Sequence, residues 1–200
     1  MEKNKHVFSS DINEAEGKDW PRFSMKKMEK ESIKLAKKIK DSSFKPNYIL
    51  AIANGGLYMA YVISKFLDVP MATIRIQRPL TNSDDSHEDI VAYAKKYRKQ
   101  KPVIMDAISI KPKKSDNIVI VDDKIDTGKT IRVLMNYLKK NFKINESQMR
   151  VASMYESDDT SFSSYVNYNT PYVPPWGERA TSKQKIDWEQ WMSSYKELRN

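Results

Sequence analysis

The chain has 200 residues, with 35 Lys and Arg against 26 Asp and Glu, which gives a formal net charge of +9. This length suits one globular domain, and a hydrophobic content of 40% excludes disorder over the whole chain. Because there are no cysteines and only two histidines, disulfide frameworks, cysteine–zinc sites, thiol nucleophiles and three-histidine metal sites are excluded. The charge indicates an anionic ligand, either nucleic acid or a small phosphorylated molecule, or else a solvated basic surface.

The start of the chain and its longest uncharged stretch predict no membrane segment. Residues 1–11 are charged and lack the apolar core of a signal peptide. Residues 48–64 are uncharged, but an Asn-Gly-Gly sequence splits them into pieces shorter than the ~20 apolar residues that a membrane span needs. We therefore expect a soluble, cytoplasmic protein without a membrane partner.

The first part of the chain alternates predicted helices and strands. A polar arm over residues 1–22 precedes an amphipathic helix over 24–40, for which a serine provides the N-cap. A continuous apolar run over 48–53 is typical of a buried parallel strand. It leads through two glycines into a helix over 57–67, and a second apolar run follows at 71–76.

The same alternation continues in the second part. A polar loop over residues 81–89 leads into a predicted helix over 88–99. The clearest strand of the sequence lies at 117–121, and a helix over 128–140 and a strand over 150–155 follow it. This order of apolar strand, loop and amphipathic helix predicts an α/β fold, an open parallel twisted sheet flanked by helices.

The C-terminal segment breaks the alternation. Residues 156–200 contain three of the four tryptophans and four tyrosines. We expect an aromatic hood that packs on the sheet and ends in a helix over 182–198. The predicted organisation is thus an arm over 1–22, a core over 23–155, and the hood as part of the same domain.

Three of the five glycines lie in two turns, each between a predicted strand and a predicted helix. Ligands of open α/β sheets bind at the carboxyl ends of strands, where a turn into a helix presents unpaired N–H groups and the positive end of the helix dipole. Glycine allows positive φ and a close approach to an anion. Either turn alone could be a plain connection, but two turns on neighbouring strands predict a phosphate site. The turns are Asn54-Gly55-Gly56 and Asp126-Thr127-Gly128-Lys129-Thr130.

Two common nucleotide-binding motifs are excluded. A P-loop needs a glycine five residues before Gly128, but Asp123 stands there, and a carboxylate pair at this point would repel a triphosphate. The dinucleotide fingerprint G-x-G-x-x-G occurs nowhere in the chain.

Residues 118–130 read Ile-Val-Ile-Val-Asp-Asp-Lys-Ile-Asp-Thr-Gly-Lys-Thr. Four apolar strand residues, two acids and a Thr/Gly turn into a helix strongly resemble the motif of type I phosphoribosyltransferases that binds 5-phosphoribosyl 1-pyrophosphate (PRPP). Lys124 departs from the family, which usually has a small or apolar residue there. Residues 48–60 resemble the family's pyrophosphate loop, and the resemblance covers about residues 24–155.

The resemblance implies a role for each part of these motifs. The turn 126–130 would bind the 5′-phosphate of PRPP through backbone N–H groups and threonine hydroxyls. Asp122 and Asp123 would accept hydrogen bonds from the ribose hydroxyls and hold Mg²⁺, directly or through water, since this ion prefers oxygen ligands. Asp126 would lie close to the incoming base and accept its proton. Mg²⁺ and the amides near residues 54–57 would neutralise the departing pyrophosphate.

The base-binding half carries a weaker resemblance. Residues 172–178 look like the Pro-Trp-Glu segment of xanthine–guanine and hypoxanthine-type phosphoribosyltransferases, whose aromatic residue covers the purine. We therefore expect Trp176 and Tyr155 to contact the nucleobase, with core packing as the alternative for Trp176. Gly177 interrupts the Trp-Glu pair, and residues 154–159 contain acids where such enzymes place a base-reading lysine.

Together these patterns predict a Mg²⁺-dependent phosphoribosyltransferase that transfers the 5-phosphoribosyl group from PRPP to a nucleobase, with a 6-oxopurine favoured. The products would be a nucleoside monophosphate and pyrophosphate, and the family resemblance implies a homo-oligomer, either a dimer or a tetramer.

One rival hypothesis is a catalytically weak or inactive protein of the same fold that binds a nucleotide or RNA as a sensor. Three features favour the rival: Asn54 replaces the usual Arg or Lys, the base-reading lysine is missing, and the net charge is +9. A purely structural binding module would leave the spacing of Asp122, Asp123 and Asp126 unexplained.

Overall fold

The computed structural model describes most of the predicted core, over residues 21–77, 100–157, 160 and 162–175. Several predicted features lie outside the described residues: the loop at 81–89, the helices at 88–99 and 182–198, and Trp176. Within the part of the chain that the structure describes, no helix combines the length and the apolar character that crossing a bilayer requires.

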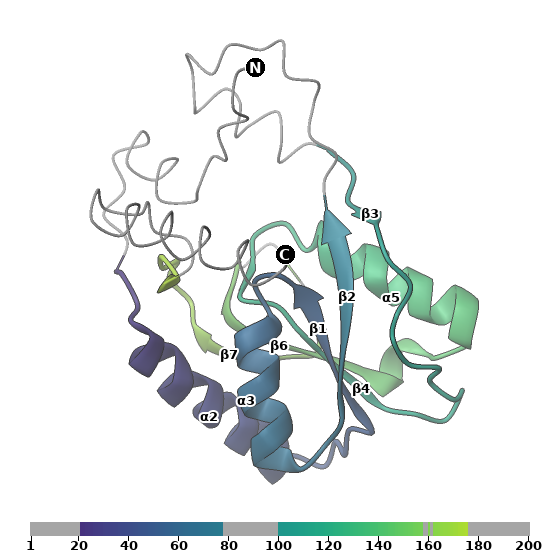
Figure 1. Cartoon of the computed structure of the whole chain (residues 1–200), viewed down its shortest axis with the longest axis horizontal. Helices are drawn as coiled ribbons and strands as arrows, with labels where there is room; N and C mark the ends of the chain where they lie inside the picture. Colours follow the sequence, from purple (N-terminus) through teal and green to yellow (C-terminus); the bar gives the residue numbers. More distant parts are fainter. Residues whose placement is uncertain (1–20, 78–99, 158–159, 161, 176–200) are drawn as a thin grey trace, which may run out of the picture.

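The described residues form one mostly parallel sheet, shown in Figure 1. Its strands are β1 (Tyr48–Ala53), β2 (Met71–Gln77), β3 (Val103–Ile104), β4 (Ile118–Val121), β5 (Lys124–Ile125), β6 (Met149–Glu156) and β7 (Ser164–Tyr168). The strand order is β3-β2-β1-β4-β6-β5, and β7 also pairs with β6. Only the β2–β3 pair is antiparallel among these strands. The predicted open parallel α/β sheet is therefore confirmed.

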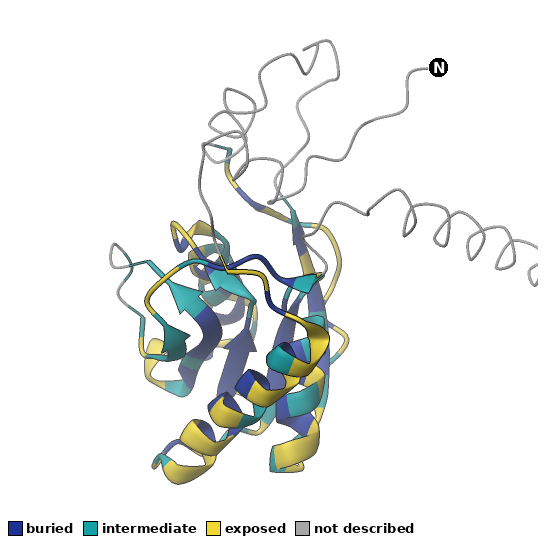
Figure 2. Ribbon diagram, turned by 90° about the vertical axis from the view of Figure 1, so that its left-hand side faces the viewer, coloured by how far each residue is buried: buried dark blue, intermediate teal, exposed yellow. Residues whose placement is uncertain are grey.

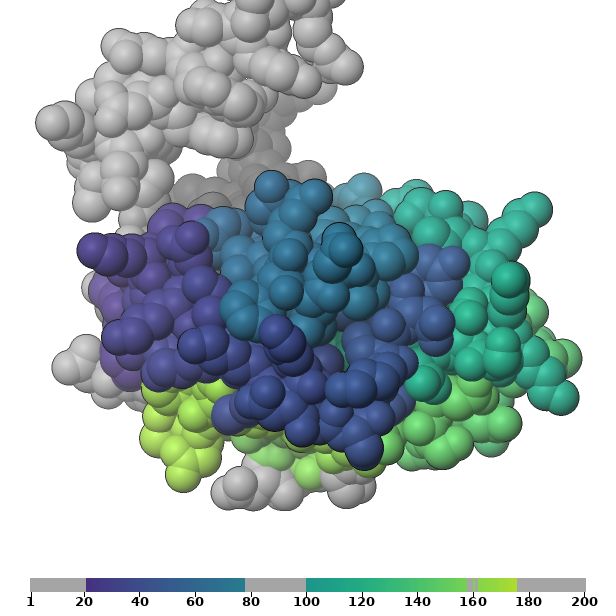
Figure 3. Space-filling view, turned by 90° about the horizontal axis from the view of Figure 1, so that it is seen from below, coloured from purple at the N-terminus to yellow at the C-terminus, as the bar shows by residue number. Residues whose placement is uncertain are grey.

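Helices cover both faces of the sheet. α2 (Met25–Asp41) and α3 (Leu57–Leu67) lie on one face, and α5 (Lys129–Phe142) lies on the other, followed by a short 3₁₀ helix, η1 (Glu146–Gln148). Seen from below, the residues of α2 and α3 lie side by side, and the teal residues from 100 onward occupy the other end of that view (Figure 3).

The period-2 alternation of the central strands divides the core into two clusters. Both clusters are fully apolar along β1 and β4, so that these strands are buried on both faces, as parallel strands usually are (Figure 2). The strand residues are Ile49, Ala51, Val119 and Val121 under α2 and α3, and Leu50, Ile52, Ile118 and Ile120 under α5. This two-sided burial explains why the two runs read as continuous apolar segments.

α2 begins and packs as its sequence predicts. Ser24 is the N-cap, and its side chain accepts a hydrogen bond of 3.2 Å from the amide of Lys27. Most of the apolar stripe is buried, with Met28, Leu35 and Ile39 at 0% exposure, but Met25 at its start is 45% exposed and Ile33 is half-buried. The helix therefore owes its position to one buried face, while most of its lysines remain in solvent.

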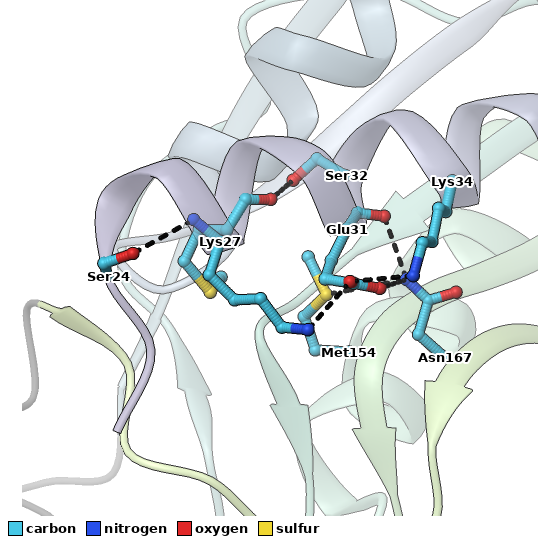
Figure 4. Close-up of polar contacts among 8 residues, drawn as sticks. Ser24, Lys27, Glu31, Ser32, Lys34, Met154 and Asn167 are labelled. Carbon is cyan, nitrogen blue, oxygen red and sulfur yellow. Dashed lines mark hydrogen bonds and ion pairs between the residues drawn. The ribbon is translucent and has the colours of Figure 1, made fainter. Parts of the chain in front are cut away.

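A buried carboxylate ties α2 to β7 (Figure 4). Glu31 Oε1 lies 3.2 Å from Lys27 Nζ and 2.9 Å from Lys34 Nζ. Asn167 Nδ2 donates to Glu31 Oε2 at 3.2 Å and to its main-chain oxygen at 2.9 Å. Burial opposes ionisation of Glu31, but the hydrogen bonds from Lys34, Lys27 and Tyr168 outweigh it and lower the pKa of this carboxyl.

The segment predicted as a hood partly joins the sheet instead. β7 pairs in parallel with β6, from Val151 opposite Ser164 to Tyr155 opposite Tyr168. β7 is short, lies at the edge of the sheet and is half-buried throughout. A half-buried edge strand needs no continuous apolar run, which is the signal by which the central strands were predicted. The remainder of the predicted hood, from residue 176 onward, lies outside the described residues.

The two ends of the described chain meet beside the sheet. Arg22 and Val173 form a parallel β-bridge. The amide of Phe23 donates to the carbonyl of Val173 at 2.9 Å, and the amide of Val173 donates to the carbonyl of Pro21 at 3.0 Å. The Phe23 ring stacks on the buried Tyr172 ring with centroids 4.4 Å apart. The segment around residues 21–23 is therefore held against the segment around 172–173.

Candidate active site

The two predicted turns lie together at the carboxyl edge of the sheet. β1 and β4 are neighbours, with Ala51 opposite Val121, so residues 54–56 and 122–123 leave the sheet side by side. This confirms that the two turns follow neighbouring strands, and it places the pair of acids next to the Asn-Gly-Gly turn.

Both glycines of the first turn allow close approach. A Cβ atom on Gly55 would lie 2.5 Å from Asp123 Oδ1 and 2.7 Å from its Cγ, so the turn's backbone lies directly against this carboxylate. A Cβ on Gly56 would overlap the carbonyl oxygen of Val121 and lie 3.0 Å from the carbonyl oxygen of Ile52. Gly56 has φ −77°, so glycine is needed there because a side chain would not fit, not because the backbone is left-handed.

Asp122 and Asp123 lie between β4 and β5, along the length of β6. The amide of Asp122 donates to the carbonyl of Ala152 and the amide of Met154 donates to the carbonyl of Asp123, each at 3.2 Å. β5 then continues the pairing, with Lys124 opposite Tyr155. The departure at Lys124 is thus accommodated as the first residue of a short strand that the sequence did not predict.

Backbone amides hold one oxygen of each carboxylate. The amide of Asp123 donates to Asp122 Oδ1 at 3.0 Å, and the amide of Lys124 donates to Asp123 Oδ1 at 2.9 Å. Both acids are half-buried. Burial and the adjacent charge of Asp123 raise the pKa of Asp122 well above its usual range, Asp126 adds to this, and Lys124 opposes it. The site therefore concentrates negative charge that a bound cation would relieve.

The second turn opens α5. Gly128 is its N-cap with φ +65° and ψ 0°, and it alone among the described glycines has positive φ. No acidic residue follows in the first turn of the helix, so its unpaired amides and dipole favour an anion. Asp126, Thr127 and Lys129 are exposed and Thr130 is half-buried. The predicted turn into a helix with positive φ at its glycine is thus observed, while its binding of phosphate stays a prediction.

Phe162 and Arg132 support the phosphate turn from the side of α5. A Cβ on Gly128 would lie 2.8 Å from the ring of Phe162 and 3.2 Å from Arg132 Nη1. The guanidinium of Arg132 lies over the Phe162 ring, 5.1 Å from its centroid. Phe162 was not singled out by the sequence, because it lies 34 positions from Gly128 and outside both motifs.

A cavity of about 510 Å³ lies beside the end of β6 and the face of β7. On its wall, the carboxylate of Glu156 accepts hydrogen bonds from Thr160 Oγ1 at 2.6 Å and from Ser164 Oγ at 2.5 Å. Ser157, also on its wall, donates its amide to the carbonyl of Ile125 at 2.9 Å. Since Ile125 immediately precedes Asp126, this cavity begins next to the phosphate turn.

The two predicted nucleobase residues are not brought together in the described structure. Tyr155 is half-buried in β6 and packs against the core cluster under α2 and α3. Trp176 lies outside the described residues. The contact of either residue with a base stays a prediction.

Two residues beside the acids were missed by sequence reasoning. The main-chain oxygen of Asp123 accepts hydrogen bonds from Ser153 Oγ at 3.1 Å and from the Tyr172 hydroxyl at 3.2 Å. Burial and the nearby charges of Asp123 and Asp122 raise the pKa of Tyr172, so this hydroxyl stays protonated and able to donate. No local pattern could reveal these contacts, because Ser153 and Tyr172 lie 30 and 49 positions from Asp123.

Comparison with known proteins shows the family and the fold. The family model for the phosphoribosyl transferase domain matches residues 23–165. The solved purine phosphoribosyltransferase from Pyrococcus horikoshii is 27% identical, with a TM-score of 0.59 over 80% of this chain and 95% of that chain. The xanthine-guanine-hypoxanthine phosphoribosyltransferase from Helicobacter pylori shares the fold at 15% identity, with a TM-score of 0.58 over 86% of this chain and 98% of that chain. No curated protein matches the chain significantly. Because the family model spans well over half of the sequence, the chain belongs to the phosphoribosyltransferase family.

Proposed function

We propose that the chain is a Mg²⁺-dependent enzyme that transfers the 5-phosphoribosyl group from PRPP to a purine base and releases pyrophosphate. One observation carries the proposal: Asp123, the second of the paired acids, lies against the backbone of Gly55, and the pair immediately precedes β5 and the turn at 126–130. A ribose that carries phosphate on one side and pyrophosphate on the other needs such a row of sites along one sheet edge.

The 5′-phosphate would bind the turn 126–130. Positive φ at Gly128 is the backbone conformation in which successive amides can converge on an anion, and the N-terminus of α5 adds the positive end of its dipole. The hydroxyls of Thr127 and Thr130 are available as further donors. This part of the proposal rests on backbone geometry that does not depend on any single side chain.

The acid pair fits a magnesium ion that is shared with the substrate. Among the described residues, no group of three or more His, Asp or Glu side chains could hold a metal ion by itself. Mg²⁺ is commonly bound through one or two carboxylates together with substrate phosphates, and Asp122 and Asp123 supply two adjacent carboxylates. When bound, the ion would neutralise charge on the pyrophosphate as it leaves. The two acids would also orient the ribose by accepting hydrogen bonds from its hydroxyls.

Pyrophosphate would be held by the first turn, but by fewer amides than the sequence suggested. The amide of Gly56 donates to the carbonyl of Ile52 at 2.9 Å, and that of Leu57 donates to the carbonyl of Asn54 at 3.2 Å. Binding would therefore fall to the amides of Asn54 and Gly55 and to the exposed Asn54 side chain. A neutral side chain at this position predicts weaker binding of pyrophosphate than an Arg or Lys would give.

The base would enter beside Asp126, which is exposed and could accept its proton. The cavity at the end of β6 begins next to this residue, which supports an acceptor site there. A purine acceptor is supported by the 27% identity to the Pyrococcus purine phosphoribosyltransferase. A 6-oxopurine and a covering role for Trp176 are the finer parts of the proposal.

Pyrophosphate release tests this function. Purified protein with PRPP and Mg²⁺ is expected to release pyrophosphate with guanine, xanthine or hypoxanthine, measured across a panel of bases. The double variant Asp122→Asn with Asp123→Asn should lose turnover but keep its fold by circular dichroism. Asp41→Asn, at the exposed end of α2, is the control and should keep full turnover.

The outcomes separate the enzyme from the sensor hypothesis. Measurable PRPP binding without release for any base would favour a nucleotide or RNA sensor, as the neutral Asn54 also does. Full turnover in the double variant would remove the two acids from the mechanism.

A further inference from the structure

The backbone at Asp123 is held by an unusual number of donors. Its carbonyl oxygen accepts hydrogen bonds from the amide of Met154 at 3.2 Å, from Ser153 Oγ at 3.1 Å and from the Tyr172 hydroxyl at 3.2 Å. The first of these belongs to the ladder between residues 122–125 and β6. The other two come from side chains, so a specific sequence is needed to provide them.

Of the two side-chain donors, the Tyr172 hydroxyl has fewer alternative acceptors than Ser153 Oγ. Ser153 has a single hydroxyl proton, and its oxygen also lies 2.8 Å from the carbonyl of Tyr155, which is the closer acceptor. Tyr172 is 1% exposed, and its ring is fixed by stacking on Phe23. The fixed ring therefore holds the Tyr172 hydroxyl at the carbonyl oxygen of Asp123.

Peptide planarity connects this carbonyl to the carboxylate of Asp123. The carbonyl of Asp123 and the amide of Lys124 belong to one rigid peptide unit. That same amide donates to Asp123 Oδ1 at 2.9 Å. A donor that fixes the carbonyl therefore also fixes the N–H group that orients the carboxylate, while Gly55 bounds the carboxylate on another side.

We propose that Tyr172 is a positioning residue for the acid pair, acting through the peptide unit between Asp123 and Lys124. The proposal rests on the proposed function, because it assigns to Tyr172 the alignment of carboxylates that would bind Mg²⁺ and PRPP. It also gives a role to the bridge between Arg22 and Val173, which holds the Phe23 and Tyr172 rings in register.

The variant Tyr172→Phe tests this, since it keeps the stacked ring and removes only the hydroxyl. Tyr165→Phe is the matched control: its hydroxyl lies 2.8 Å from Ser42 Oγ, where α2 ends, away from the acids. PRPP binding by calorimetry in Mg²⁺ and the midpoint of thermal unfolding are measured for both variants and the wild type. Pyrophosphate release gives the KM values for PRPP and base separately.

Loss of one neutral hydrogen bond predicts a rise of about fivefold in the Kd and KM for PRPP in Tyr172→Phe, with an unchanged KM for the base. Tyr165→Phe should leave both unchanged. Ser153→Ala should raise the Kd less than twofold, because the Ser153 proton has a closer acceptor in Tyr155.

The possible failures differ between the two proposals. If Tyr172→Phe and Tyr165→Phe lower the unfolding midpoint alike and both keep the wild-type Kd for PRPP, the role of Tyr172 is structural only and the positioning proposal is wrong. A larger effect on the KM for the base than on that for PRPP would likewise overturn it. Wild-type protein that binds PRPP without turnover would overturn the proposed enzymatic function. The ratio of the Kd for PRPP in Tyr172→Phe to that in the wild type would still decide the role of Tyr172. Wild-type protein that binds no PRPP would overturn both.

Discussion

Substitution by alanine should have different consequences at the two adjacent glycines of the first turn. Gly56→Ala would place a Cβ against the carbonyl of Val121 and 3.0 Å from the carbonyl oxygen of Ile52, and both atoms belong to paired strands. Gly56 has φ −77° and ψ −11°, which alanine adopts freely, so the cost is steric. Overpacking of this kind costs about 1–3 kcal/mol. At roughly 2–4 °C for each kcal/mol in a chain of this size, Tm should fall by about 2–12 °C.

Gly55→Ala instead meets the end of a side chain. The new Cβ would lie 2.5 Å from Asp123 Oδ1, so the carboxylate must move by roughly 1 Å to reach an ordinary contact distance. The tip of Asp123 can rotate, but it then loses its hydrogen bond from the amide of Lys124, so the stability cost should be about 0.5–1.5 kcal/mol. Misplacement of a substrate-binding group by 1 Å can cost on the order of 100-fold in rate.

Scanning fluorimetry and pyrophosphate release, measured well below the lower Tm, separate these effects. We expect Gly56→Ala to show the larger loss of Tm and Gly55→Ala the larger loss of turnover. Equal losses of Tm in the two variants, or wild-type turnover in Gly55→Ala, would refute the packing of this turn against Asp123.

Three further predictions concern charge and stacking. Asp122→Asn should raise Tm near neutral pH and weaken PRPP binding. The pKa of Asp122 is higher in the folded than in the unfolded state, so ionisation of this carboxyl opposes folding. The difference in Tm between the variant and the wild type should therefore shrink as the pH falls toward the ordinary carboxyl pKa of about 3.9. Glu31→Gln should cost about 1.5–3 kcal/mol, because it removes charge-assisted hydrogen bonds from Lys27 and Lys34. Because folding lowers the pKa of Glu31, its ionised form stabilises the protein above about pH 4.5, and this stabilisation is lost below that pH. Denaturant titrations should therefore give the wild type and Glu31→Gln the same free energy of unfolding in acid. A difference in acid as large as that at neutral pH would contradict the role of the Glu31 charge. Trp176→Ala should raise the KM for the base more than that for PRPP, by the ~1–3 kcal/mol of base–aromatic stacking, whereas equal effects on the two KM values would indicate core packing.

The sequence predicted the central elements because each one carries its own local signal. The runs at 48–53 and 71–76 are buried on the sheet, where they form β1 and β2, the second one residue longer than predicted. The predicted helix over 128–140 is observed as Lys129–Phe142, with Gly128 at the positive φ that a phosphate turn requires. The motif 118–130 likewise predicted the strand β4 and the turn that opens α5, since all of its residues are consecutive in the chain, while the binding roles of its acids and of its turn stay predictions.

The short edge elements were not predictable in the same way. β5 has two residues and β7 is half-buried along its whole length, so neither has an apolar run or a clear alternation. Both owe their strand conformation to β6, which supplies hydrogen-bonding partners on its two sides. A hood was therefore inferred from aromatic content in a segment that begins with a strand of the main sheet.

The sequence alone predicted the acid pair and the two turns of the candidate site, because two strands each run directly into a turn with its own signature, but it did not reveal Phe162, Ser153 or Tyr172. Tertiary structure decided how those side chains are held. The contact of Gly55 with Asp123 joins the first turn to the acid pair across 68 positions, and the hydroxyl of Tyr172 reaches Asp123 across 49 positions. Such contacts depend on the order of strands in the sheet and on the packing of the chain ends, neither of which leaves a periodic or local trace in the sequence.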